Sequence, residues 1–206
     1  MSNRNGADRN FTRRNKMNTR EEWLVAVAVK AERSLFEPNG YTLPKYRVTC
    51  GFPSKSALAS KKRRIGECWS PSASNDSTTE IIISMTIDSP TQAIGILIHE
   101  MVHASVGCEH GHRKPFKKCA LAVGLEGKMT STTESQQLVD NFINPVIKEL
   151  GEYPHSAIDY SQRKKQSTRM IKIECSSCGI KFRASRTVAE QCNVCPVCEE
   201  ETLIIG

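Results

Sequence analysis

The segment between residues 89 and 107 combines metal ligands with a candidate base. Its sequence, SPTQAIGILIHEMVHASVG, carries His99 and His103 four residues apart, with Glu100 between them. Four residues are about one helical turn, so both imidazoles would lie on one face of a helix. This H-E-x-x-H pattern is typical of zinc peptidases, in which the histidines bind the ion and the glutamate takes a proton from water. A carboxylate in so apolar a run is costly unless a cation lies near, which favours a metal site over a chance match.

The same segment carries the start and stop signals of a helix from about residue 90 to 106. Ser89 and Gln92 form a capping box, Pro90 suits the first helical position, and Gly107 suits the residue after the last turn. A catalytic zinc uses three protein ligands and leaves a fourth position to water. The third ligand must therefore come from another part of the chain.

The surrounding chain predicts the remaining elements of a compact α+β domain, a small sheet packed by helices. Alternating or apolar runs bounded by turn residues predict three strands, at residues 46–50, 65–69 and 80–85. Helices are predicted from Thr19 to before Pro38, from Pro115 to Gly124, and from Ser131, with Glu134 as its capping partner, to Gly151.

The last 36 residues hold five of the nine cysteines. Four of them form C-x-x-C…C-x-x-C with sixteen residues between the pairs, a spacing that wraps one tetrahedral zinc ion: Cys175, Cys178, Cys195 and Cys198. Cys192 makes a competing pair with Cys195. A module this small needs the metal to fold, so we expect a structural zinc in a zinc ribbon.

Composition indicates a cytoplasmic protein. The N-terminus lacks the apolar stretch of a secretory signal, and no run approaches the roughly 18 apolar residues of a membrane span. An odd number of cysteines without an export signal favours metal binding and reduced thiols over a disulfide framework. The net charge of +7 suggests a polyanionic partner, although a solvated basic surface would give the same value.

These features divide the chain into a basic disordered arm at 1–18, a catalytic domain at 19–154, a basic linker at 155–170 and the zinc ribbon at 171–206. We expect non-specific contacts with single- or double-stranded DNA phosphates from two basic clusters. Their residues are Lys61, Lys62, Arg63 and Arg64, and Arg163, Lys164 and Lys165.

With these pieces in place, the chain resembles the SprT-like (Spartan-related) zinc metallopeptidase family, and most closely its short phage and bacterial members. Five motifs carry the resemblance over most of the chain. They are VTCGFPS at 48–54, RIGECWS at 64–70, HEMVHA at 99–104, GHRKPF at 111–116 and GLEGKMT at 124–130. The resemblance implies a zincin-like domain with one catalytic zinc held by three histidines, often followed by a zinc ribbon.

Carried over residue by residue, the resemblance makes His99 and His103 ligands and Glu100 the catalytic base. The family's third ligand is a histidine four residues before an aromatic residue, which corresponds to His112 before Phe116. Arg113 stands where the family usually has glycine, so two further candidates remain for the third ligand, His110 and Cys108.

The resemblance implies a peptidase that hydrolyses peptide bonds with metal-activated water and acts on proteins associated with DNA. The alternative is a non-catalytic module that binds zinc and nucleic acid. A structural zinc is closed by four protein ligands, whereas a catalytic zinc keeps an open position, and this difference separates the two hypotheses.

Overall fold

The computed structural model describes residues 19–162, 170–192, 194–201 and 203–205. These residues form a mixed α+β chain of two compact units, divided between Tyr160 and Ser161. The predicted arm at 1–18 and the basic cluster Arg163, Lys164 and Lys165 lie outside the described residues. Within the described ranges, no helix has the length and apolar character needed to cross a membrane.

The first unit contains a three-stranded sheet with the order β1-β3-β2. β1 (Tyr46–Gly51) runs parallel to β3 (Thr79–Ser84), and β2 (Gly66–Trp69) runs antiparallel to β3, with Cys68 opposite Ile81. All three strands fall where their apolar alternation predicts them. β2 forms one edge of the sheet, and helix α2 packs against it.

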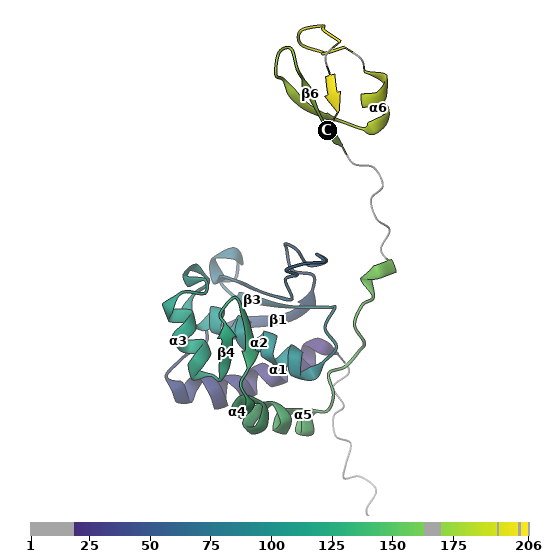
Figure 1. Ribbon diagram of the computed structural model, residues 1–206. Helices are drawn as coiled ribbons and strands as arrows, with labels where there is room; N and C mark the ends of the chain where they lie inside the picture. The colour runs from purple at the N-terminus through teal and green to yellow at the C-terminus, as the bar shows by residue number, and fades with distance from the viewer. Residues whose placement is uncertain (1–18, 163–169, 193, 202, 206) are drawn as a thin grey trace, which may run out of the picture. The chain divides into compact units, whose positions relative to one another are not determined.

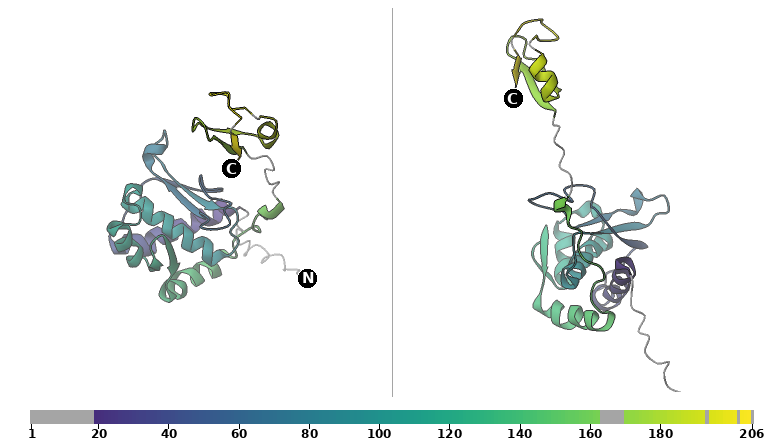
Figure 2. Two further views of the ribbon diagram at one scale, coloured as in Figure 1. Left: turned by 45° about the horizontal axis from the view of Figure 1, so that its top comes forward. Right: turned by 90° about the vertical axis from the view of Figure 1, so that its right-hand side faces the viewer.

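Two long helices, α1 (Arg20–Ala31) and α2 (Pro90–Val106), lie side by side against the sheet (Figures 1 and 2). The Thr19 side chain and Glu22 form a reciprocal capping box at the start of α1. At the start of α2 the Ser89 side chain accepts a hydrogen bond from the backbone amide of Gln92. Gly107 follows the last turn of this helix. The predicted bounds of α2 are therefore confirmed.

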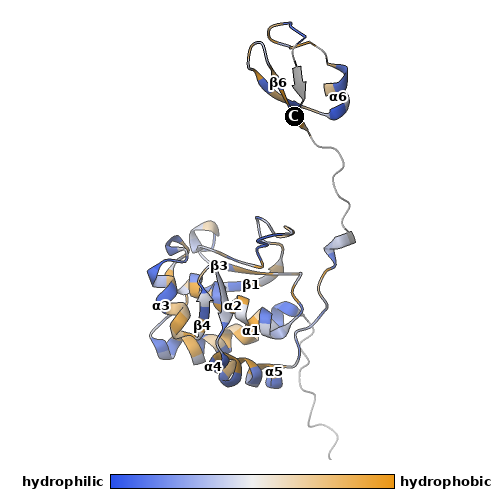
Figure 3. Cartoon of the chain, in the orientation of Figure 1, coloured by the Kyte–Doolittle hydropathy of each residue, from blue (hydrophilic) through white to orange (hydrophobic). Residues whose placement is uncertain are grey.

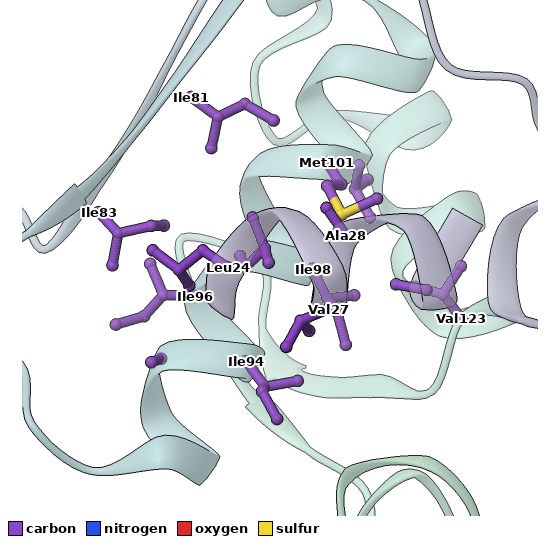
Figure 4. Packing of buried hydrophobic residues seen from close by; sticks show 14 of the residues in the cluster. Leu24, Val27, Ala28, Ile81, Ile83, Ile94, Ile96, Ile98, Met101 and Val123 are labelled. Atoms are coloured by element: carbon purple, nitrogen blue, oxygen red, sulfur yellow. The ribbon is translucent and has the colours of Figure 1, made fainter. Parts of the chain in front are cut away.

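The core of this unit lies where α1, α2 and β3 meet. Ten residues of α2 are buried, and the helix is apolar along most of its length (Figure 3). Figure 4 shows Leu24 and Val27 of α1, Ile94 and Ile98 of α2, and Ile83 of β3 among the buried side chains of this cluster. Packing on several sides holds α2 firmly, and α2 carries the H-E-x-x-H residues.

A turn that contains the short 3-10 helix Cys108–His110 connects α2 to α3 (Lys114–Ala122). A hairpin of β4 (Leu125–Lys128) and β5 (Ser131–Glu134) follows. The chain then forms the helical segment α4 (Gln136–Leu138), the π-helix Val139–Ile143 and α5 (Asn144–Leu150). Between residues 19 and 160 the unit also has short helical turns at Glu32–Phe36, Glu37–Asn39 and Pro71–Ala73.

The predicted helix start at Ser131 is wrong. Ser131–Glu134 is strand β5, and the Ser135 side chain caps the following helix by accepting from the Leu138 amide at 3.2 Å. The two consecutive threonines between Ser131 and Glu134 favour an extended strand, which pairs with β4. This correction matters because β5 brings a residue of the hairpin to the histidines of α2.

The described residues of the second unit form a three-stranded sheet with the order β7-β6-β8 and one helix. Its elements are β6 (Ile171–Cys175), β7 (Lys181–Ala184), α6 (Arg186–Gln191) and β8 (Leu203–Ile205), and the 3-10 turn Tyr160–Gln162 spans the division between the units. Its buried apolar cluster comprises Ile173, Ala184 and Ala189. So small a core supplies little stability without a metal or a similar cross-link.

Candidate metal centres

Three histidines converge at the C-terminal half of α2. The Nε2 atom of His112 lies 3.2 Å from that of His99 and 3.2 Å from that of His103. His99 and His103 are one turn apart on α2, and His112 reaches them from the turn before α3. These side chains form a group that could hold a metal ion.

The spacing of the nitrogen atoms fits a tetrahedral metal. Zinc–nitrogen bonds of 2.0–2.1 Å place two ligand nitrogens about 3.3 Å apart in a tetrahedron. The 3.2 Å separations match that value. A neutral imidazole carries one ring proton, so three converging Nε2 atoms with their Nδ1 protons retained present three lone pairs to a common point.

Two glycines shape the turn that carries His112. Gly107 has φ 98° and Gly111 has φ 50°, backbone conformations that side chains of L-residues rarely adopt. A Cβ atom at Gly107 would also lie 2.3 Å from a carboxylate oxygen of Glu109. The chain can therefore reverse within a few residues after α2 and bring His112 back over His99 and His103.

Phe116 supports all three imidazoles from one side. Its ring is fully buried, and its centroid lies 4.9 Å from that of His99, 4.4 Å from that of His103 and 4.8 Å from that of His112. Phe116 is one turn beyond His112 at the start of α3. The aromatic residue that marked His112 as the candidate third ligand in the sequence thus also packs beneath the three histidines.

Thr132 of β5 fixes the orientation of His99. Its Oγ1 atom lies 2.8 Å from His99 Nδ1. If Nδ1 carries the ring proton and donates it to Thr132, Nε2 keeps its lone pair for a metal. No local pattern links these residues, because they are 33 positions apart in the sequence.

Burial keeps the histidines neutral. It lowers the pKa of His99 to about 3, with smaller contributions from the charges of His103 and His112, and it lowers the pKa of His103 to about 4. The pKa of the more exposed His112 is lowered for the same reason. Neutral imidazole is the form that binds metals, so the site is ready to accept a cation at neutral pH.

Glu100 lies against the edge strand β2. Its side chain is 6% exposed, and a Cβ atom at Gly66 would lie 2.4 Å from Glu100 Oε1. Burial raises the pKa of Glu100 to about 8; the nearby Cys108 raises it further, and Arg64 lowers it. A base acts best when its pKa is near the working pH, and a cation beside it would favour the carboxylate.

One cleft, with a volume of about 850 Å³, is lined by the three histidines and by Glu100. Strand β2 borders this cleft, as do residues 130–134 of the β4–β5 hairpin. The cleft is large enough to admit a segment of another chain beside the histidines.

The two other candidates for the third ligand lie apart from this group. His110 Nε2 lies 3.6 Å from a carboxylate oxygen of the exposed Glu109. The sulfur of Cys108 lies 3.5 Å from that of Cys68. Among the described residues, the metal-type group at this position contains only the three histidines.

A second metal-type group lies in the C-terminal unit. The sulfur atoms of Cys175 and Cys198 are 3.6 Å apart, as are those of Cys178 and Cys195. Zinc–sulfur bonds of 2.3 Å give a tetrahedral edge of about 3.8 Å, so this group could also hold a metal ion. The exposed Cys192 lies outside the group.

The two C-x-x-C pairs sit on turns of the same kind. The Gly179 amide donates to the Cys175 carbonyl at 2.9 Å, and the Glu199 amide donates to the Cys195 carbonyl at 2.9 Å. Gly179 and Glu199 both have positive φ, 72° and 60°. This repeated turn brings both pairs of sulfurs to one point.

The basic residues at 61–64 occupy the rim of the histidine cleft. Lys62, Arg63 and Arg64 line it, and Lys61 is exposed. Arg64 is paired with the buried carboxylate of Glu67, and Arg63 donates a hydrogen bond to the Tyr160 hydroxyl. Arg63 and Arg64 therefore make contacts within the protein that stabilise the rim of the cleft.

Comparisons of this chain with protein-family models, with curated proteins and with solved structures found no match.

Proposed function

We propose that this protein is a zinc-dependent peptidase of the SprT-like type with a zincin-like first unit. One observation carries the proposal: three histidine nitrogens converge at tetrahedral spacing in a cleft that also contains Glu100. The motifs that resemble the SprT-like family include the segments that supply these residues.

A zinc ion, when bound, supplies a Lewis acid that polarises a carbonyl group and makes water more acidic. His99, His103 and His112 would hold the ion, and Thr132 would keep His99 in the required tautomer. Glu100 would accept a proton from the attacking water on its carboxylate and later donate it to the leaving amine.

The number of ligands favours an enzyme over a closed structural site. Among the described residues, no fourth histidine, cysteine, aspartate or glutamate joins the group of three histidines. A structural zinc is closed by four protein ligands, whereas a catalytic zinc leaves one position open. The four cysteines of the second unit have the composition of a structural zinc site.

The proposed substrates are proteins held on DNA. The family resemblance suggests this class, and the basic residues Lys62 and Arg63 at the rim of the cleft support it. Lysine and arginine side chains of this kind contact phosphates, which are the same in every DNA sequence. We therefore expect DNA binding that does not depend on base sequence.

Casein hydrolysis by zinc-loaded protein, with and without single-stranded DNA, tests the proposal. Glu100→Gln should keep its zinc and lose at least about 100-fold in kcat, because the amide cannot accept the proton. Glu109→Gln, at the exposed glutamate of the neighbouring turn, should hydrolyse casein at the wild-type rate. Unchanged turnover in Glu100→Gln would exclude this residue as the base.

A further inference from the structure

Two thiols that the proposed chemistry does not use lie side by side in the wall of the cleft. The sulfur atoms of Cys68 and Cys108 are 3.5 Å apart, and the Cys108 sulfur is also 3.6 Å from the Cys68 carbonyl oxygen. Both residues are partly exposed and line the same cleft as Glu100. An oxidant of the size of a peroxide that enters the cleft can therefore reach them.

The two cysteines come from elements that hold different parts of the site. Cys68 is on β2, the strand against which Glu100 packs. Cys108 opens the short 3-10 helix that links α2 to His112. A bond between these sulfurs would cross-link the edge strand to the segment that presents the third histidine.

We propose that Cys68 and Cys108 form a reversible disulfide under oxidising conditions, and that this disulfide weakens metal binding at the histidine centre. The pair is distinct from the four cysteines of the C-terminal unit. It lies in the first unit, next to the residues that would bind the ion and move the proton.

Hydrogen peroxide is the simplest oxidant that balances the reaction. The Cys108 thiol loses its proton, and the resulting thiolate attacks a peroxide oxygen. The O–O bond breaks, and the departing hydroxide takes up the proton that Cys108 lost to form water. Cys68 then attacks the sulfur of the resulting sulfenic acid, the S–S bond forms, and a second water leaves. Two electrons pass from the sulfurs to the peroxide, and a dithiol reductant reverses the step by thiol–disulfide exchange.

The surroundings of the two thiols favour Cys108 as the attacking thiolate. Its hydrogen bond with Cys68 lowers the pKa of Cys108 from its ordinary value, whereas the same bond and burial raise the pKa of Cys68. The thiolate is the nucleophile in such reactions. Cys68 then lies within reach as the resolving thiol.

The geometry indicates which part of the site moves. A disulfide needs a sulfur–sulfur distance of about 2.0 Å, so the sulfurs must approach by about 1.5 Å. β2 is fixed by its ladder to β3, whereas Cys108 lies in a short turn between Gly107 and Gly111. The turn should therefore shift toward β2 and carry His112 out of alignment with His99 and His103 on α2.

The test uses the full-length zinc-loaded protein, treated with graded hydrogen peroxide and then alkylated for peptide mapping by mass spectrometry. We expect a peptide linked through Cys68 and Cys108 at peroxide levels that leave the four ribbon cysteines unlinked. The fully buried Cys119 should be unmodified, and dithiothreitol should remove the link. Absence of the linked peptide at levels that oxidise the exposed Cys192 would overturn the proposal.

A chelator competition measures the effect on the metal. Zinc at the histidine centre should bind at least about tenfold more weakly after oxidation, and reduction should restore it. Cys68→Ser should keep its affinity under the same treatment, whereas Cys192→Ser should behave as the wild type. Equal affinity before and after the disulfide forms would refute the coupling. Neither measurement uses hydrolysis, so the result stands apart from the proposed peptidase activity.

Discussion

Replacing Thr132 with valine tests whether the hairpin tunes the histidine centre. Valine keeps the shape of threonine and removes the hydroxyl that lies 2.8 Å from His99 Nδ1. His99 would then lose the partner that fixes its tautomer and ring orientation. Removal of such an outer partner typically weakens metal binding 10–100-fold, which corresponds to about 1.4–2.7 kcal/mol.

The measurement is zinc affinity by competition with a chromophoric chelator at pH 7.5, with circular dichroism to verify the fold. Thr133→Val is the matched control, because Thr133 is exposed and borders the same cleft, whereas the hydroxyl that contacts His99 is that of Thr132. We expect a tenfold or greater loss for Thr132→Val and wild-type affinity for Thr133→Val. A change of less than twofold for Thr132→Val would refute the positioning role of Thr132.

Three further changes probe the surroundings of the centre. Phe116→Ala should lower the free energy of unfolding by about 3–5 kcal/mol in urea titrations, and Phe116→Leu by about 1.5 kcal/mol or less, because the buried ring packs against all three imidazoles. Equal losses would contradict that packing. Gly66→Ala should keep zinc and lower kcat at least tenfold, because the new Cβ atom would lie 2.4 Å from Glu100 Oε1 and displace this carboxylate. A wild-type kcat would show that Glu100 has room to shift without loss of activity. Lys62→Glu, at the rim of the cleft, should weaken oligonucleotide binding in anisotropy titrations and reduce the salt dependence of that binding. The control is Lys148→Glu, at an exposed lysine of α5, which should bind as the wild type does. Equal effects of the two changes would argue against a DNA contact at the rim.

The sequence predicted the parts of the fold that depend on local spacing. The helix at 90–106 follows from Ser89, Pro90 and Gly107, because caps and breakers act within a few residues. The three strands of the first sheet follow from apolar runs bounded by turn residues. The four clustered cysteines follow from the spacing of the two C-x-x-C pairs, because each pair occupies one tight turn.

Features that depend on contacts between distant segments could not be predicted in this way. Ser131 and Glu134 have the spacing of a capping box, yet pairing with β4 makes them a strand. That pairing brings Thr132 to His99, and the fold of the sheet brings Cys68 to Cys108, 40 residues later. The position of His112 beside His103 could be predicted only through the family resemblance, because the turn between them has no regular period.

Native mass spectrometry of the purified, zinc-loaded chain tests the central claim most directly, since it counts the metal ions held by intact protein. The account predicts two zinc ions per chain, one retained by His99→Ala and one retained by Cys175→Ser. A single zinc ion in the wild-type protein would contradict the presence of two metal sites, and two zinc ions in His99→Ala would contradict a metal centre formed by the three histidines.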